Sequence, residues 1–166
     1  MATLISLPIL AVLVIAQSAV VSRVTLLQGS ADLILLVLVA WALQPRVQNA
    51  LIWAAVGGLL ISFPTALPPG VALIGYMAAT MLALVLRRRV WQVPVLAMLV
   101  AIILGTLITQ GLAWISLRFI GVPLPFLQSF YLVLLPSLLL NLLLAVPIYI
   151  LAGDLAGWLQ PQEIEI

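Results

Sequence analysis

Apolar residues dominate this chain and fall into long runs, separated by short breaks that contain proline, glycine or arginine. A helix that crosses a bilayer needs about 20 consecutive, mostly apolar residues. The pattern therefore predicts helical spans over residues 4–21, 31–44, 47–63, 70–86, 90–117 and 126–152. We expect an all-α bundle of about six transmembrane helices.

The second and third predicted spans are the shortest of the six, because Pro45 interrupts the helical pattern between them. A crossing takes at least about 17 residues, and each of these segments is near or below that length. Two tilted spans or a single re-entrant hairpin would both fit, and we favour two spans. Asp32 precedes the second segment, where a carboxylate suits the positive amino end of a helix.

Composition narrows the class of protein further. Only 6% of the residues are charged and 66% are hydrophobic, and the mean hydropathy is +1.40. A soluble domain has about 25% charged residues, so this chain could not keep a surface that faces water. We interpret residues 1–166 as one transmembrane domain of an integral membrane protein.

All six basic residues are arginines, and their positions predict the orientation in the membrane. With six spans, Arg46 and the Arg87-Arg88-Arg89 cluster fall on one side, and Arg23 and Arg118 fall on the other. Because basic residues accumulate in cytoplasmic loops, we expect both termini to be cytoplasmic. The Arg87-Arg88-Arg89 cluster is interpreted as a topology signal in contact with anionic lipid, or as a docking site for a cytoplasmic partner.

Small residues recur at every fourth position in three of the predicted spans, which keeps them on one helix face. Such stripes let helices approach closely in lipid, so each faces another helix of this chain or a partner's helix. The candidate positions are Ala50, Ala54, Gly58, Gly75, Ala79, Ala97, Ala101, Gly105 and Thr109.

Polar residues form two spots within the spans, and we expect them to bond to neighbouring helices rather than to a ligand. Thr106, Thr109 and Gln110 form one spot, and Ser137 and Asn141 form the other. In the same last span Pro147 removes a backbone donor and should bend the helix.

No catalytic constellation is present, because the chain has no Cys, His or Lys. The four acidic residues, Asp32, Asp154, Glu163 and Glu165, lie at or outside the ends of the predicted spans. A nucleophile needs a base and an orienting group. We therefore expect no enzymatic activity, no metal site, no cofactor and no binding of nucleic acid.

Four stretches carry a resemblance to a known family. They are Asp32 to Leu43, Gly57-Gly58-Leu59-Leu60 before a proline-rich loop, Gly75-Tyr76, and Leu135 to Asn141 followed by Pro147-Ile148-Tyr149. In this order they resemble the rod shape-determining protein MreD family of bacterial membrane proteins. The family often has an Asp after the Gly-Leu-Leu run, where this chain has Ser62-Phe63.

The resemblance implies a non-enzymatic protein of the bacterial cytoplasmic (inner) membrane that takes part in cell elongation. It implies the bitopic protein MreC as a partner, and through it RodA, penicillin-binding protein 2 and, indirectly, the cytoskeletal protein MreB. It also implies a fold similar to the substrate-binding components of energy-coupling-factor transporters.

Two other classes of protein remain open. The first is a substrate-binding component of an energy-coupling-factor vitamin transporter, although the apolar loops Phe63–Gly70 and Gly121–Pro125 suit a polar vitamin poorly. The second is a channel or exporter subunit, which the absence of charge within the spans disfavours.

Overall fold

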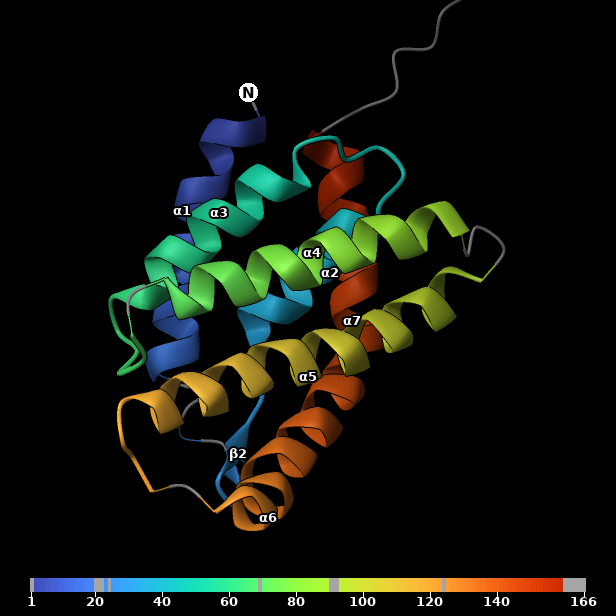
Figure 1. Ribbon diagram of the computed structural model, residues 1–166. Coiled ribbons are helices and arrows are strands. Elements are labelled where there is room, and N and C mark those ends of the chain that lie inside the picture. Colours follow the sequence, from blue (N-terminus) through green and yellow to red (C-terminus); the bar gives the residue numbers. More distant parts are fainter. Residues whose placement is uncertain are drawn as a thin grey trace, which may run out of the picture.

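The computed structural model of this protein describes residues 2–19, 23, 25–68, 70–89, 93–123 and 125–159. This part of the chain is mostly helical (Figure 1). The helices are α1 (Ala2–Ala19), α2 (Leu33–Leu43), α3 (Ala50–Ser62), α4 (Val71–Arg89), α5 (Pro94–Phe119), α6 (Phe126–Ser129), the π-helical turn η2 (Phe130–Leu134) and α7 (Leu135–Leu159). The strands β1 (Thr25–Leu26) and β2 (Gly29–Ser30) pair in antiparallel fashion between α1 and α2.

Each predicted span contains a helix, but several boundaries differ from the prediction. The last helical segment runs without interruption from Phe126 to Leu159, beyond the predicted end at residue 152. The predicted start of the fifth span, residues 90–92, lies outside the described residues. The β1–β2 hairpin was not predicted, because its strands have only two residues each and leave no alternating pattern in the sequence.

Within the described residues, three helical segments are long and apolar enough to cross a membrane: Val71–Arg88, Pro94–Phe119 and Phe126–Leu159. The helices α2 and α3 have 11 and 13 residues. At 1.5 Å per residue, α2 is roughly 16 Å long, about half of a hydrocarbon core of about 30 Å. The expectation of six helices is thus met, whereas the lengths support spanning for three of them.

The short helix α2 is the centre of the bundle. It contacts α1, α3, α4, α5 and α7, and residues from Ile34 to Leu43, all but Val37, are buried. In Figure 1, α3, α4 and α5 lie side by side, and α2 lies between this layer and α7. A helix that is apolar on every side must be surrounded by protein or lipid, and here its neighbours surround it.

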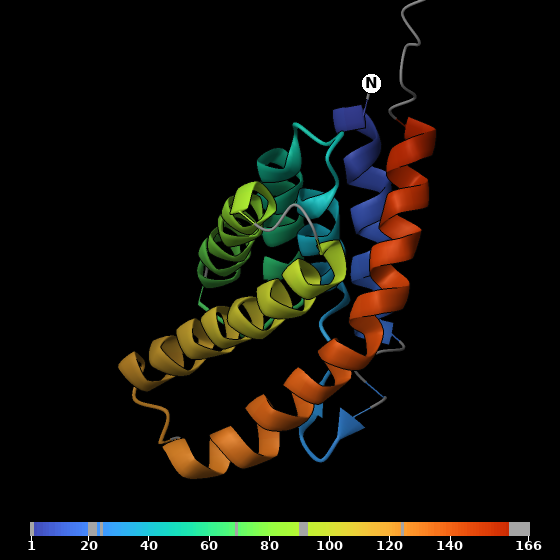
Figure 2. The same ribbon diagram turned by 90° about the vertical axis from the view of Figure 1, so that its right-hand side faces the viewer.

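The chain alternates in direction from one long helix to the next, so each loop lies at one of two opposite ends. The start of α1 and the end of α7 lie at the same end of the molecule (Figures 1 and 2). Arg46 belongs to this end as well, since a β-carbon built at Gly157 of α7 would lie 3.5 Å from Nη1 of Arg46.

Candidate functional site

The amino end of α2 is capped by the half-buried side chain of Asp32. Its Oδ1 accepts the backbone N–H of Leu35 at 2.9 Å, as expected of an N-cap carboxylate. Its Oδ2 accepts the phenol O–H of Tyr76 from α4 at 2.9 Å. The predicted place of Asp32 at a helix start is therefore confirmed, and the carboxylate also ties α2 to α4.

Asn141 extends this network to two further helices. Its Oδ1 accepts the backbone N–H of Asp32 at 2.7 Å, and its Nδ2 donates to Oγ1 of Thr106 in α5 at 3.0 Å. The Asn141 side chain is fully buried. Thr106 of one predicted polar spot and Asn141 of the other thus meet at the amino end of α2. The prediction was wrong for the rest of the first spot, because Thr109 bonds within its own helix and Gln110 lines a separate cleft.

Gln17 of α1 completes the same network. Its Nε2 donates to the carbonyl oxygen of Ala31 at 2.7 Å, and its Oε1 accepts the N–H of Leu33 at 2.8 Å. We call the group the α2 cap network, and its members are Gln17, Asp32, Tyr76, Thr106 and Asn141. Backbone groups without partners are costly in a membrane interior. This network supplies hydrogen bonds to the backbone at the start of α2, in the place of water.

The β1–β2 hairpin docks on the last helical segment beside the α2 cap network. Pro136 has no N–H, so the carbonyl of Leu132, four residues earlier, loses its usual α-helical partner. The backbone N–H of Gln28 donates to that carbonyl at 3.0 Å, and the N–H of Ser30 donates to Oγ of Ser137 at 3.2 Å. Because Pro136 has no N–H, the Leu132 carbonyl is free to accept the bond that holds the hairpin.

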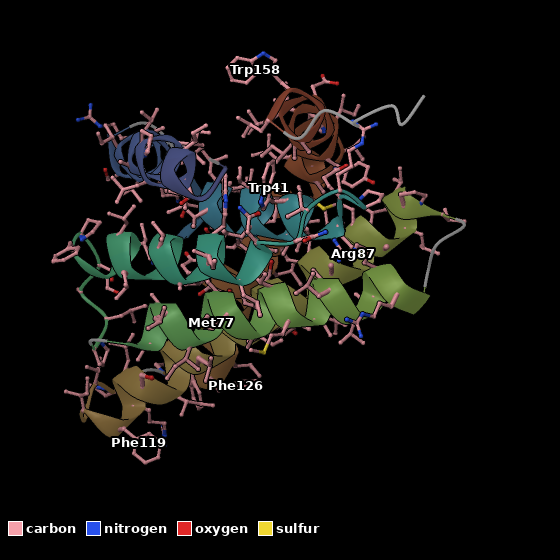
Figure 3. The ribbon with its side chains drawn as sticks, turned by 90° about the horizontal axis from the view of Figure 1, so that it is seen from above. Trp41, Met77, Arg87, Phe119, Phe126 and Trp158 are labelled. Carbon is pink, nitrogen blue, oxygen red and sulfur yellow. The ribbon has the colours of Figure 1, made fainter. Side chains whose placement is uncertain are left out.

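The carboxyl end of α2 is satisfied by a cation. Nη1 of Arg87 donates to the carbonyl oxygens of Gln44 and Val47, at 2.8 and 2.9 Å. A positive charge at this end of a helix is favoured by the free carbonyls and the helix dipole. Figure 3 shows Arg87 and Trp41 among the packed helices, whereas Phe119 and Trp158 extend outward.

The remaining residues of the predicted basic cluster are not used in this way. Arg88 is exposed, and the side chain of Arg89 lies outside the described residues. The cluster is thus divided, because Arg87 acts within the fold and Arg88 is free to contact lipid headgroups or a partner.

The small-residue stripes lie between helices of this chain. Ala50, Ala54, Gly58, Gly75, Ala79, Ala97, Ala101 and Gly105 are all buried, and Thr109 is partly buried. A β-carbon at Gly105 would lie 3.3 Å from Cβ of Ala79 and from Cδ1 of Leu35. One at Gly75 would lie 3.3 Å from Cγ2 of Thr109. The stripes on α4 and α5 therefore face each other, with α2 beneath them.

Two other predicted positions differ in their surroundings. Ser137 is buried and holds the hairpin, as described above. Pro147 is exposed on α7, so it does not lie at a contact within the bundle. Ser62, where the resembled family often has Asp, donates to the carbonyl of Gly58 in its own helix at 2.6 Å.

A separate apolar cleft of about 240 Å³ lies between α5 and the α6–η2 segment. Its lining residues are Gln110, Gly111, Ala113, Trp114, Leu117, Phe126, Ser129, Phe130, Val133 and Leu134. In Figure 2 α5 packs against α7 near the amino end of α5, and the two walls diverge toward the loop that joins α5 to α6.

Sequence reasoning identified Asn141 and Thr106 as polar spots but missed the roles of Gln17 and Tyr76. Both lie in apolar runs, where a single polar residue gives no indication of its partner. The one signal available was Asp32 itself, since a carboxylate at the start of an apolar helix needs donors from outside that helix.

A scan against protein-family models, a search of curated proteins and a search of solved structures each found no match to this chain.

Proposed function

We propose that this chain is a non-enzymatic membrane component of the bacterial cell-elongation machinery, as its resemblance to the MreD family implies. In this proposal it assembles with an MreC-like bitopic protein and so connects peptidoglycan synthesis with the cytoskeleton.

One observation carries the proposal. Three of the four stretches on which the resemblance rests are far apart in the sequence, yet Asp32, Tyr76 and Asn141 join in one hydrogen-bonded network. Residues with a shared structural task are expected to recur together in a family of one fold. The hydrogen bonds among these three residues give the resemblance a physical basis that hydrophobic composition alone would not provide.

The chemistry of the interior also favours an assembly role over a polar-substrate site. The polar atoms of Asn141 and the carboxylate of Asp32 bond to other groups of the fold, and the cleft beside α5 is mainly apolar. A polar vitamin needs several convergent polar groups. The vitamin-transporter alternative therefore has less support than an assembly protein.

The test is depletion of the protein in its own bacterium, combined with purification of a tagged copy from the membrane. We expect depleted cells to lose their rod shape, and the tagged protein to bring down a bitopic coiled-coil partner. Unchanged cell width together with co-purification of an ATPase module would overturn the proposal and favour the vitamin-transporter alternative.

A further inference from the structure

The cleft between α5 and the α6–η2 segment has an apolar, aromatic interior that no helix of the described chain fills. Trp114 and Phe126 face each other across it with ring centroids 5.3 Å apart, in an edge-to-face arrangement. Phe130 continues the aromatic wall beyond Phe126. Deeper in the cleft, a β-carbon at Gly111 would meet nothing within 4 Å.

The cleft exists because the last helical segment is held away from α5. The wide turn η2 and the hairpin bonds to Leu132 and Ser137 fix the opposite side of that segment. The opening is thus part of the folded structure and is available for an occupant.

The size of the cleft limits what can enter it. The open space in the cleft is about 240 Å³. Apolar cavities of about 150 Å³ accept a molecule the size of benzene. A flexible hydrocarbon chain of several methylene groups therefore fits.

Polar groups are arranged at one edge of the cleft. The guanidinium carbon of Arg118 lies 5.6 Å from the ring centroid of Trp114, which places a positive charge beside a lining residue. Among the described residues, neither an ion pair of Arg118 nor a hydrogen bond of the Gln110 side chain is found. Gln110 lies one helical turn, about 5–6 Å, before Trp114.

We propose that this cleft binds an anionic phospholipid, with one acyl chain between α5 and η2. The phosphate lies at Arg118, because an arginine matches a phosphate in both charge and geometry. The Gln110 amide lies deeper in the cleft, one turn before Trp114 and two turns before Arg118 in α5, and donates to an ester carbonyl of the lipid. The acyl chain then runs past Gly111 toward Val133 and Leu134.

The experiment measures lipid that stays bound to the purified protein. The full chain is reconstituted in vesicles of equal parts phosphatidylglycerol and phosphatidylcholine and extracted in mild detergent, and native mass spectrometry counts the bound lipids. Wild type should retain one phosphatidylglycerol. Arg118→Gln should lower the preference for phosphatidylglycerol about tenfold, the effect of losing one charged hydrogen bond.

Gly111→Leu fills the cleft where space is open, so it should fold normally and lose the retained lipid of either kind. Arg88→Gln is the matched control, because it removes an exposed arginine from the carboxyl end of α4, at the opposite end of the molecule from Arg118. It should leave retention of the lipid in the cleft at the wild-type level. Equal retention by wild type and by both cleft variants would overturn the proposal. Retention that disappears only with Arg88→Gln would place the lipid at the other end of the molecule. If Gly111→Leu unfolds, Arg118→Gln still decides, because Arg118 is exposed.

Discussion

Gly58 marks the closest approach between α3 and α4. A β-carbon there would lie 2.7 Å from Cα of Leu73, a separation that real structures do not tolerate, and the obstructing atom belongs to the backbone. In lipid, van der Waals contact between helices takes the place of the hydrophobic drive that assembles soluble bundles. At this position the absence of a side chain therefore decides how closely two helices pack.

We predict that Gly58→Ala destabilises the protein by about 1–3 kcal/mol, the usual cost of overpacking. Gly111→Ala is the control, because its new methyl group would meet nothing within 4 Å and alanine has the higher helix propensity. Thermal unfolding of both variants in the same detergent measures the difference. Equal unfolding temperatures would show that α3 and α4 are not packed as described.

The bond between Asn141 and Thr106 permits a second test at the level of residues. Asn141→Leu leaves the N–H of Asp32 and the hydroxyl of Thr106 without this partner. We predict a coupling energy of about 0.6–1.7 kcal/mol between Asn141→Leu and Thr106→Val, the range found for hydrogen bonds between membrane helices. The measurement is a double-mutant cycle of unfolding free energies.

Ser116 provides the control for that cycle. Its hydroxyl donates to the carbonyl of Leu112 within α5, so Ser116→Ala and Asn141→Leu should add independently. A coupling between Asn141 and Thr106 no larger than in this control would contradict the α2 cap network.

Among the elements, the α2 helix is unusual because it is both short and fully enclosed. Its 11 residues are packed on most sides by other helices, and side chains from these neighbours satisfy its termini. Asp32 with Asn141 and Gln17 serves the amino end, and Arg87 serves the carboxyl end. Such an arrangement lets polar termini lie inside an apolar bundle without unpaired backbone groups.

The hydrophobic pattern was sufficient to place the helices but not their contacts. Runs of apolar residues and breaks such as Pro45 located each helix, although the last one ends at Leu159 rather than at residue 152. The β1–β2 hairpin and η2 could not be predicted, because Gln28 and Leu132 are joined by one backbone bond across more than 100 positions. The local sequence around Gln28 or Leu132 does not indicate that the two residues pair. Only Pro136, which leaves the Leu132 carbonyl free, can be recognised in the sequence.

We predict that Pro136→Ala weakens the docking of the hairpin. The new N–H would compete with that of Gln28 for the Leu132 carbonyl, and η2 would tend toward ordinary α-helix. Hydrogen exchange should show faster exchange of the Gln28 amide, while amides in the middle of α5 keep their rates. Exchange of Gln28 as slow as in wild type would indicate that the hairpin does not depend on this acceptor.

Pro147→Ala is the matched control, because this proline lies in the same helix but is exposed and far from the hairpin. It should leave the exchange of Gln28 unchanged. An equal acceleration in both variants would mean that any change in the bend of α7, rather than the Leu132 carbonyl, governs docking.

At the scale of the whole molecule, the arginines are divided between two opposite ends. Arg87 bonds to the turn that follows α2, and Arg46 lies against the end of α7. Arg118 lies at the far end of α5, which runs opposite to α4 (Figure 1). Arg46 and Arg87, which the sequence pattern predicts on one side of the membrane, thus lie at the same end of the fold. Sequence alone could not show that one of them, Arg87, is also a structural cap.

We predict that the end with Arg46 and Arg87 is cytoplasmic, because basic residues accumulate on that side.

The chain contains no cysteine, so single cysteines at exposed loop positions report sidedness without background. Gln48→Cys, in the turn after α2, should react with an impermeant maleimide only after the membrane is opened. Val122→Cys, in the loop after α5, should react in intact spheroplasts. Reaction of Gln48→Cys in intact spheroplasts would reverse the orientation, and equal reaction of both would show that the two loops lie on the same side of the membrane. The same labelling also assigns the phospholipid cleft to a leaflet, since Arg118 lies four residues before Val122.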